Sequence, residues 1–172
     1  MPDRFVGAWV RISIALGEAP ASEPAFVVWV QGRSAYADLR VPHTGDGVEC
    51  FAGHTTWEPP HLRWSHDLDL AGGPAAVTDV GHVDWVDGDL VESGTFVIDG
   101  REVPYVEVWR RLPGSDGRVV EVTDAGYTQV AVGEHELTVV DDRANDGTFS
   151  AQYRRAGEVV RAIGELVDTV TS

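Results

Sequence analysis

The chain has 172 residues, a length that predicts one domain spanning residues 1–172 with a core of its own. Its 28 acidic side chains outnumber 13 basic ones, and a net charge of −15 argues against nucleic acid or an anionic membrane as a partner. No stretch approaches the about 18 consecutive apolar residues of a membrane span, and no signal peptide precedes the first predicted strand, so we expect a cytoplasmic protein.

Short alternating runs separated by turn dipeptides dominate the sequence from the N-terminus onward. Asp87-Gly88 and Asp99-Gly100 suit the tight turns of hairpins, and no spacer has the length of the helix that a parallel pair requires. About ten antiparallel strands would leave exposed edges unless the sheet closed, so we predict a mainly β protein, a single meander closed into a barrel. The predicted strands are Val6–Ile14, Phe26–Gln31, Ser34–Val41, Val48–Ala52, Leu62–Leu70, Thr78–Val86, Leu90–Ile98, Tyr105–Leu112, Val119–Thr123, Tyr127–Val132 and Glu136–Val140.

Two interpretations of the C-terminal segment, residues 148–170, stay open. Its apolar residues fall on one helical stripe, which predicts a C-terminal helix. The same segment also fits two strands, Thr148–Arg154 and Val159–Leu166, with a turn at Ala156-Gly157. The stripe consists of Phe149, Tyr153, Ala156, Val159, Val160, Ile163, Leu166, Val167 and Val170.

Alternation divides the strands into an aliphatic face and a mixed face of rings and charges. If the mixed face were in water, most of the tryptophans would be exposed, so we predict that it faces the barrel lumen and forms a small-molecule pocket. The aliphatic face then needs a cover, either the C-terminal segment or a second subunit. The aliphatic set is Val10, Ile12, Ile14, Phe26, Val28, Val30, Ala35, Ala37, Leu39, Val41, Val106 and Val108. The residues predicted to bind a ligand in the lumen are Trp9, Trp29, Gln31, Tyr36, Asp38, Arg40, Trp64, His66, Tyr105, Glu107, Trp109 and Arg111.

A family resemblance supports the barrel. Gly7-Ala8-Trp9, at the start of the first strand, resembles the Gly-x-Trp motif of lipocalins and the wider calycin barrels, where the tryptophan packs at the closed base. The longer pattern is similar to uncharacterised bacterial lipocalin-like proteins over about residues 5–112, and this resemblance implies a calycin-type barrel without an established activity. The pattern consists of residues 28–31, 36–42, 51–53, 64–69, 79–81, 92–94 and 105–110.

Three functional hypotheses follow. The first is a binding barrel for a small hydrophobic ligand with a polar or acidic head, in which Asp38 pairs with Arg40 and Glu107 with Arg111. The second is a lumenal acid–base enzyme of decarboxylase, cyclase or isomerase type, with Glu107 and a tyrosine as proton carriers. Its inventory is similar to that of phenolic acid decarboxylases, which are small lipocalin-like enzymes. The third is a barrel that forms a homodimer through its aliphatic outer face.

The sequence predicts neither a metal site nor a cofactor. The six histidines do not have the spacing of metal ligands, and the single cysteine, Cys50, rules out an intrachain disulfide. Haem in a calycin barrel would need an inward histidine, for which His66 and then His82 are the candidates, as in nitrobindins. The chain contains no lysine, which excludes Schiff-base chemistry on a lysine amine.

Overall fold

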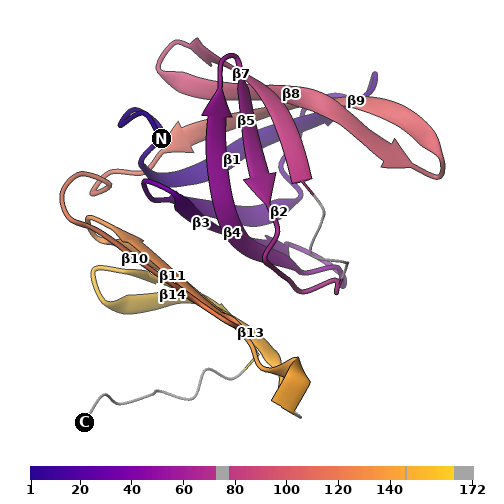
Figure 1. Cartoon of the computed structure of the whole chain (residues 1–172). Coiled ribbons are helices and arrows are strands. Elements are labelled where there is room, and N and C mark those ends of the chain that lie inside the picture. Colours follow the sequence, from indigo (N-terminus) through magenta and orange to yellow (C-terminus); the bar gives the residue numbers. More distant parts are fainter. Residues whose placement is uncertain (73–77, 146, 165–172) are drawn as a thin grey trace, which may run out of the picture.

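A computed structural model describes residues 1–72, 78–145 and 147–164, which form two antiparallel sheets (Figure 1). The larger sheet has the order β3-β2-β1-β9-β8-β7-β5-β4-β6, and an additional pairing of β3 with β4 closes eight of its strands into a barrel. The short strand β6 adds to β4. The strands of this sheet are β1 (Gly7–Leu16), β2 (Ala25–Gln31), β3 (Ala35–Pro42), β4 (Glu49–Glu58), β5 (His61–Ser65), β6 (Leu68–Asp69), β7 (Thr78–Val86), β8 (Asp89–Ile98) and β9 (Arg101–Arg111).

The predicted fold class, a mainly β protein with a closed antiparallel barrel, is confirmed. The barrel has eight strands rather than about ten, because the strands after β9 leave it and form a five-stranded sheet in the order β10-β11-β12-β13-β14. These strands are β10 (Val119–Asp124), β11 (Tyr127–Val132), β12 (His135–Asp141), β13 (Phe149–Arg155) and β14 (Glu158–Ile163), with a single 3₁₀ turn η1 (Arg143–Asn145) before β13.

The hairpin turns form where the dipeptides predicted them. Asp87 and Gly88 have φ values of 52° and 90°, and Asp99 and Gly100 have φ values of 51° and 75°. Two successive positive φ angles define a type I′ turn, whose twist matches that of antiparallel strands. These two turns join β7 to β8 and β8 to β9, the strands that carry one wall of the barrel interior.

The second sheet covers the aliphatic outer face of the barrel strands β2, β3 and β4 (Figure 1). Aliphatic residues such as Val28 and Leu39 on the barrel pack there against Val130, Leu137 and Val139, and all of these side chains are fully buried. One core therefore joins the two sheets. The cover is broader than the predicted C-terminal segment, because β11 and β12, predicted as barrel strands, contact the barrel, and Phe149, Ala151 and Tyr153 of that segment join the same core.

The C-terminal segment forms two strands, and the alternative of a helix is wrong for its described part. β13 and β14 are joined at Ala156 and Gly157, which have φ values of 50° and 83°. The neighbouring Val159 and Val160 are β-branched and favour strand over helix. Leu166, Val167 and Val170 of the predicted stripe lie outside the described residues. No helix in the described ranges is long and apolar enough to cross a membrane.

Two departures from simple alternation change which residues face inward. A β-bulge between Arg11 and Ser13 shifts the register of β1 against β9, so Ile14 lies opposite Glu107 while Ser13 lies opposite Val108. The extra residue of a bulge reverses the faces beyond it. Ile14, predicted on the outer face, therefore shares a face with Glu107.

The predicted strand Leu62–Leu70 is also interrupted. It divides into β5 and β6, which both pair with β4, and the chain bends between them at His66 and Asp67. β4 is correspondingly longer than the predicted Val48–Ala52. The bend removes His66 from the regular alternation of Leu62 and Trp64.

Candidate functional site

A cavity of about 80 Å³ lies inside the barrel. One water needs roughly 10–15 Å³ of such volume, so the space admits a group of several non-hydrogen atoms. Asp79, Val80 and Thr95 are exposed to solvent and form its rim. The lining residues are Trp29, Tyr36, Asp38, Arg40, Phe51, Trp64, Asp79, Val80, Glu92, Thr95, Phe96, Tyr105, Glu107 and Trp109.

Aromatic rings make up much of the wall. Trp64 and Trp109 both meet Trp29 edge-on, with ring centroids 5.9 and 5.7 Å away. Phe96 stacks on Tyr105 with 4.1 Å between centroids. The Trp109 indole N–H, which is buried, has no acceptor among the residues that the structure describes. The wall thus offers flat apolar surfaces and one unused hydrogen-bond donor.

Glu92 and Glu107 face each other directly across β8 and β9, and both carboxyl groups are buried. Like charges at directly opposite positions repel each other. Burial and the neighbouring Glu107 raise the pKa of Glu92 to about 8. Its carboxyl group accepts a hydrogen bond of 2.7 Å from the hydroxyl of Tyr105. At neutral pH Glu92 therefore keeps its proton while it lines the cavity.

Two glycines make room for this pair. A Cβ atom at Gly81 of β7 would lie 2.6 Å from Cγ of Glu92, and one at Gly94 of β8 would lie 2.7 Å from Cε1 of Tyr105. The Glu92 chain and the Tyr105 ring therefore lie against bare backbone on the neighbouring strands. Any larger residue at Gly81 or Gly94 would push them away from the wall.

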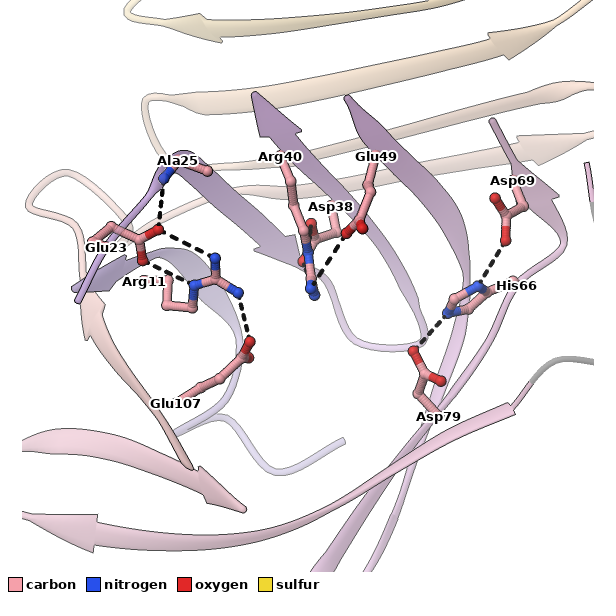
Figure 2. A network of polar contacts seen from close by, with 10 residues as sticks. All are labelled: Arg11, Glu23, Ala25, Asp38, Arg40, Glu49, His66, Asp69, Asp79 and Glu107. Atoms are coloured by element: carbon pink, nitrogen blue, oxygen red, sulfur yellow. Dashed lines mark hydrogen bonds and ion pairs between the residues drawn. The ribbon is translucent and has the colours of Figure 1, made fainter. Parts of the chain in front are cut away.

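The arginines of the lumen are already paired with carboxylates (Figure 2). The Arg11 guanidinium donates to Glu107 at 2.5 Å and to Glu23, in the loop after β1, at 2.9 Å. The Arg40 guanidinium donates to Asp38 at 2.9 Å and lies 3.8 Å from Glu49. Both ion pairs are deep enough to need partners, since an unpaired buried charge is costly. Neither arginine is left with a free charge for an anionic ligand.

His66 links two aspartates beside the cavity (Figure 2). Its Nδ1 lies 3.2 Å from Asp69 and its Nε2 lies 3.1 Å from Asp79, and the ring stacks on Phe51 at 4.3 Å. Burial lowers the pKa of His66, but the hydrogen bonds to Asp79 and Asp69 outweigh it and the net pKa is raised. Because Asp79 and Phe51 both line the cavity, His66 holds part of its wall without lining it.

The structure brings together most of the residues predicted for the lumen and separates four others from the cavity. Trp29, Tyr36, Asp38, Arg40, Trp64, Tyr105, Glu107 and Trp109 line it. Trp9 is buried beneath Trp29 and Trp85, Gln31 bonds with the indole N–H of Trp29, and His66 lies behind Phe51.

Arg111 differs most from its prediction. It lies at the end of the barrel near Gly7 and donates hydrogen bonds to the carbonyl oxygens of Val6 and Ser115. The expected pair of Arg111 with Glu107 is wrong, since Glu107 pairs with Arg11. Arg11 shares the inward face of β1 before the bulge, where it lies opposite Trp109 rather than opposite Glu107. Glu107 lies two residues before Trp109 on the same face of β9, which makes it a diagonal neighbour of Arg11.

Sequence reasoning missed several lining residues, above all Glu92. Its run alternates in the same way as the others, and Leu90 and Glu92 do share the buried face of β8. The signal was the mirror arrangement of Glu92 and Glu107 about the predicted Asp99-Gly100 turn. In a hairpin with a two-residue turn, residues equally far from the turn on the two strands are paired. Glu92 and Glu107 are equally far from Asp99-Gly100, so they lie opposite each other. The other missed lining residues are Phe51, Asp79, Val80, Thr95 and Phe96.

No group of three or more metal-ligating side chains gathers in the part of the chain that the structure describes. Both ring nitrogens of His66 contact carboxylates, and His82 is exposed beside His61. Neither histidine is directed at the cavity as an axial ligand would be.

Comparison with protein families gives one match. The family model described as Protein HRI1 matches residues 8–165, which includes both the barrel and the second sheet. Neither the curated proteins nor the solved structures yielded a match.

Proposed function

We propose that this chain, which belongs to the HRI1 protein family, binds a small molecule inside its barrel. The observation that carries the proposal is the cavity, where aromatic rings and buried ionisable groups share one enclosed wall. Apolar walls with a few placed polar groups are typical of small-molecule sites. The rings would hold the body of the ligand, and the polar groups would orient its head.

We further propose that the barrel is lipocalin-like. Its eight antiparallel strands follow meander order and β1 pairs with β9 to close the barrel, and the tryptophan of Gly7-Ala8-Trp9 is buried against Trp85. An eight-stranded barrel leaves space for one small ligand after its side chains are in place. This architecture supports a binding role and by itself names no ligand.

Of the two head groups that the sequence suggested, the neutral or polar one fits better than the acidic one. Arg40 and Arg11 already form ion pairs with Asp38 and Glu107. An anionic head would have to break one of these pairs and leave a carboxylate without its cation. A head group that accepts a hydrogen bond from the Trp109 indole N–H, or that hydrogen-bonds with the Glu92 carboxyl group, leaves both ion pairs intact.

Native mass spectrometry of freshly purified protein, with a denatured spectrum of the same sample, tests the proposal. We expect extra mass on the native ion that disappears on denaturation. The comparison is Gly94→Leu, whose side chain would enter the space of the Tyr105 ring, with Val97→Leu at an exposed position of the same strand as control. Loss of the extra mass in Gly94→Leu but not in Val97→Leu assigns it to the cavity. A native ion of apo mass, together with no binding of the probes described below, would reject the proposal.

The second candidate is a lumenal acid–base enzyme, and one observation favours it. Glu92 has a pKa of about 8 and shares a hydrogen bond with Tyr105, so it can donate and accept a proton near neutrality. Glu107, the proton carrier expected from the sequence, is instead ion-paired with Arg11. Incubation with a metabolite extract, followed by mass spectrometry, should show a substrate consumed by the wild type and retained with Glu92→Gln. Equal consumption by both proteins would exclude this role for Glu92.

A further inference from the structure

We infer that the cavity takes an organic cation, an amine, amidine or guanidine carried on a flat apolar group. This inference rests on the proposed binding function and names the chemical class of its ligand. It follows from the balance of charged groups around the cavity and from the rings that accompany them.

Glu92 is the one carboxyl deep in the cavity wall that has no cation. It is 8% exposed, and its carboxyl group accepts a hydrogen bond of 2.7 Å from the Tyr105 hydroxyl. No arginine or histidine of the described residues lies within ion-pair distance of it. The neighbouring carboxylates differ from Glu92 in this respect, because Asp38 forms an ion pair with Arg40 and Glu107 forms one with Arg11. Glu92 therefore has no counter-ion among the described residues once it gives up its proton.

Glu107 is the charged group that acts most strongly on Glu92 and it is negative, while Arg40 and Asp38 act on Glu92 in opposite directions. From β9 Glu92 faces Glu107 and Tyr105, and from β7 it lies opposite Val83 and packs against the backbone of Gly81. Asp38 and Arg40 of β3 neutralise each other across the cavity, and Arg11 of β1 is shared between Glu107 and Glu23. Asp79 adds a carboxylate at the rim, held by His66. A cation on the ligand would balance the negative charge that these residues leave uncompensated when Glu92 is ionised.

The rings supply the second part of the site. Trp29, Trp64 and Trp109 line the same cavity as Glu92, and Phe96 stacks on Tyr105. Aromatic faces attract cations, and the attraction grows when water is excluded. A planar amidinium or guanidinium head can also donate two parallel hydrogen bonds to one carboxylate. The combination of a lone buried carboxyl with several rings fits this ligand class better than it fits an anion.

Ionisation of Glu92 accompanies binding. The free protein holds a proton on Glu92, because burial and Glu107 raise its pKa to about 8. When the cation binds, Glu92 becomes a carboxylate and its proton goes to solvent. Below pH 8 the affinity for a permanently charged ligand should therefore rise with pH, by at most tenfold per unit.

Three isosteric probes separate the alternatives: benzamidine, which is a cation, benzamide, which is neutral, and benzoate, which is an anion. Binding to the full chain is measured at pH 8.5 by isothermal calorimetry and by the fluorescence of the cavity tryptophans. We expect benzamidine to bind at least tenfold more tightly than benzamide, and benzoate to bind most weakly. Between pH 6 and pH 8 the affinity for benzamidine should rise, with a proton released to the buffer.

Glu92→Gln is the matching variant, and Glu102→Gln is its control, an identical change at an exposed position of β9. Glu92→Gln should weaken benzamidine at least tenfold at pH 8.5, abolish the proton release and weaken benzamide much less than benzamidine. Glu102→Gln should bind all three probes as the wild type does. An equal loss in both variants would mean that net charge, rather than Glu92, attracts the cation, and would overturn the inference.

The outcomes distinguish the inference from the function on which it rests. If benzamide or benzoate binds as tightly as benzamidine, the barrel still binds small molecules and the assignment of a cation is wrong. If no probe binds and the native mass shows no ligand, the proposal that the barrel binds a small molecule is itself rejected. The ranking of the three probes on the wild type decides the inference even if Glu92→Gln does not fold.

Discussion

The two faces of strand β3 meet two different interiors. Outward, Ala35, Ala37 and Leu39 join a mainly aliphatic core with the second sheet that contains no charged side chain among the described residues. Inward, Asp38 and Arg40 face a cavity with four carboxyl groups and several rings. The aliphatic core is filled and needs nothing further, whereas the barrel interior stays partly open and carries charges that must be balanced. The comparison teaches that the two sides of one strand contribute to stability in different ways: by apolar packing between the sheets, and by paired buried charges together with ring packing inside the barrel.

The largest effect is expected from removal of a buried cation inside the barrel. Arg11→Met leaves Glu107 without a cation, opposite Glu92. Breaking a buried pair on one side costs about 3–5 kcal/mol. Urea denaturation at pH 7.5 measures the free energy of unfolding. Arg33→Met, which removes an exposed pair with Asp3, should change it by less than about 1 kcal/mol. The double variant Arg11→Met/Glu107→Leu should recover part of the lost free energy of unfolding, because it removes the unpaired carboxylate. If nothing is recovered, the loss comes mainly from the packing of the aliphatic part of Arg11.

The next effect concerns the core between the sheets. Leu39 is fully buried there, so Leu39→Ala should lower the free energy of unfolding by about 2–5 kcal/mol. Benzamidine affinity should be unchanged, because Leu39 points away from the cavity. Val97→Ala, at a side chain that is 73% exposed, serves as control and should be within about 0.5 kcal/mol of the wild type. A matching loss of affinity in Leu39→Ala would contradict the separation of the two interiors.

Glu92 gives the barrel interior a pH dependence that the aliphatic core does not have. Its pKa is raised from 4.5 to about 8 in the folded protein, so between these values the folded chain holds a proton that the unfolded chain has lost. Stability should fall as pH rises through this window, by up to about 1.4 kcal/mol per unit from this group. Glu92→Gln removes the contribution, and unfolding followed from pH 5 to pH 9 should give a shallower curve than that of the wild type. Parallel curves would mean that Glu92 is ionised in the folded state.

The smallest effect is expected at His66. Its pKa is raised, because its bonds to Asp79 and Asp69 outweigh burial, so its stabilising contribution is complete below pH 6.5 and disappears as pH rises through the folded value. His66→Gln should cost about 1 kcal/mol at pH 6 and little at pH 9. His43→Gln, at an exposed histidine, should show no such difference between the two pH values. A constant cost for His66→Gln at both values would indicate packing on Phe51 instead.

Most of the strands could be predicted because their signals are local. The period of two and the dipeptides Asp87-Gly88 and Asp99-Gly100 act within a few residues, and they place β7, β8 and β9 closely. The inward position of the tryptophans also follows from alternation, since Trp9, Trp29, Trp64 and Trp109 are all buried inside the barrel. These features depend on short-range backbone geometry and on the hydrophobic effect.

The remainder depends on contacts between distant residues. The register of β1 against β9 has no marker in the sequence, yet by placing Arg11 opposite Trp109 it decides that Glu107 pairs with Arg11 and not with Arg111. The division into a barrel and a second sheet is likewise set by which apolar faces pack together, and each strand taken alone fits either sheet. The lone carboxyl of Glu92 becomes visible only when β8 is placed against β9.

Strand β3 lines the cavity with one face and packs against the second sheet with the other. The width of the cavity therefore depends on the position of the second sheet. Close-packed interiors resist compression, so an outward displacement of β3 that widened the cavity would press on β11 and β12. The second sheet therefore acts as a mechanical backing for one wall of the cavity. A ligand larger than the cavity could bind only if it displaced β3 toward the second sheet, which costs free energy. The rigidity of the contact between the sheets therefore limits the size of the ligand.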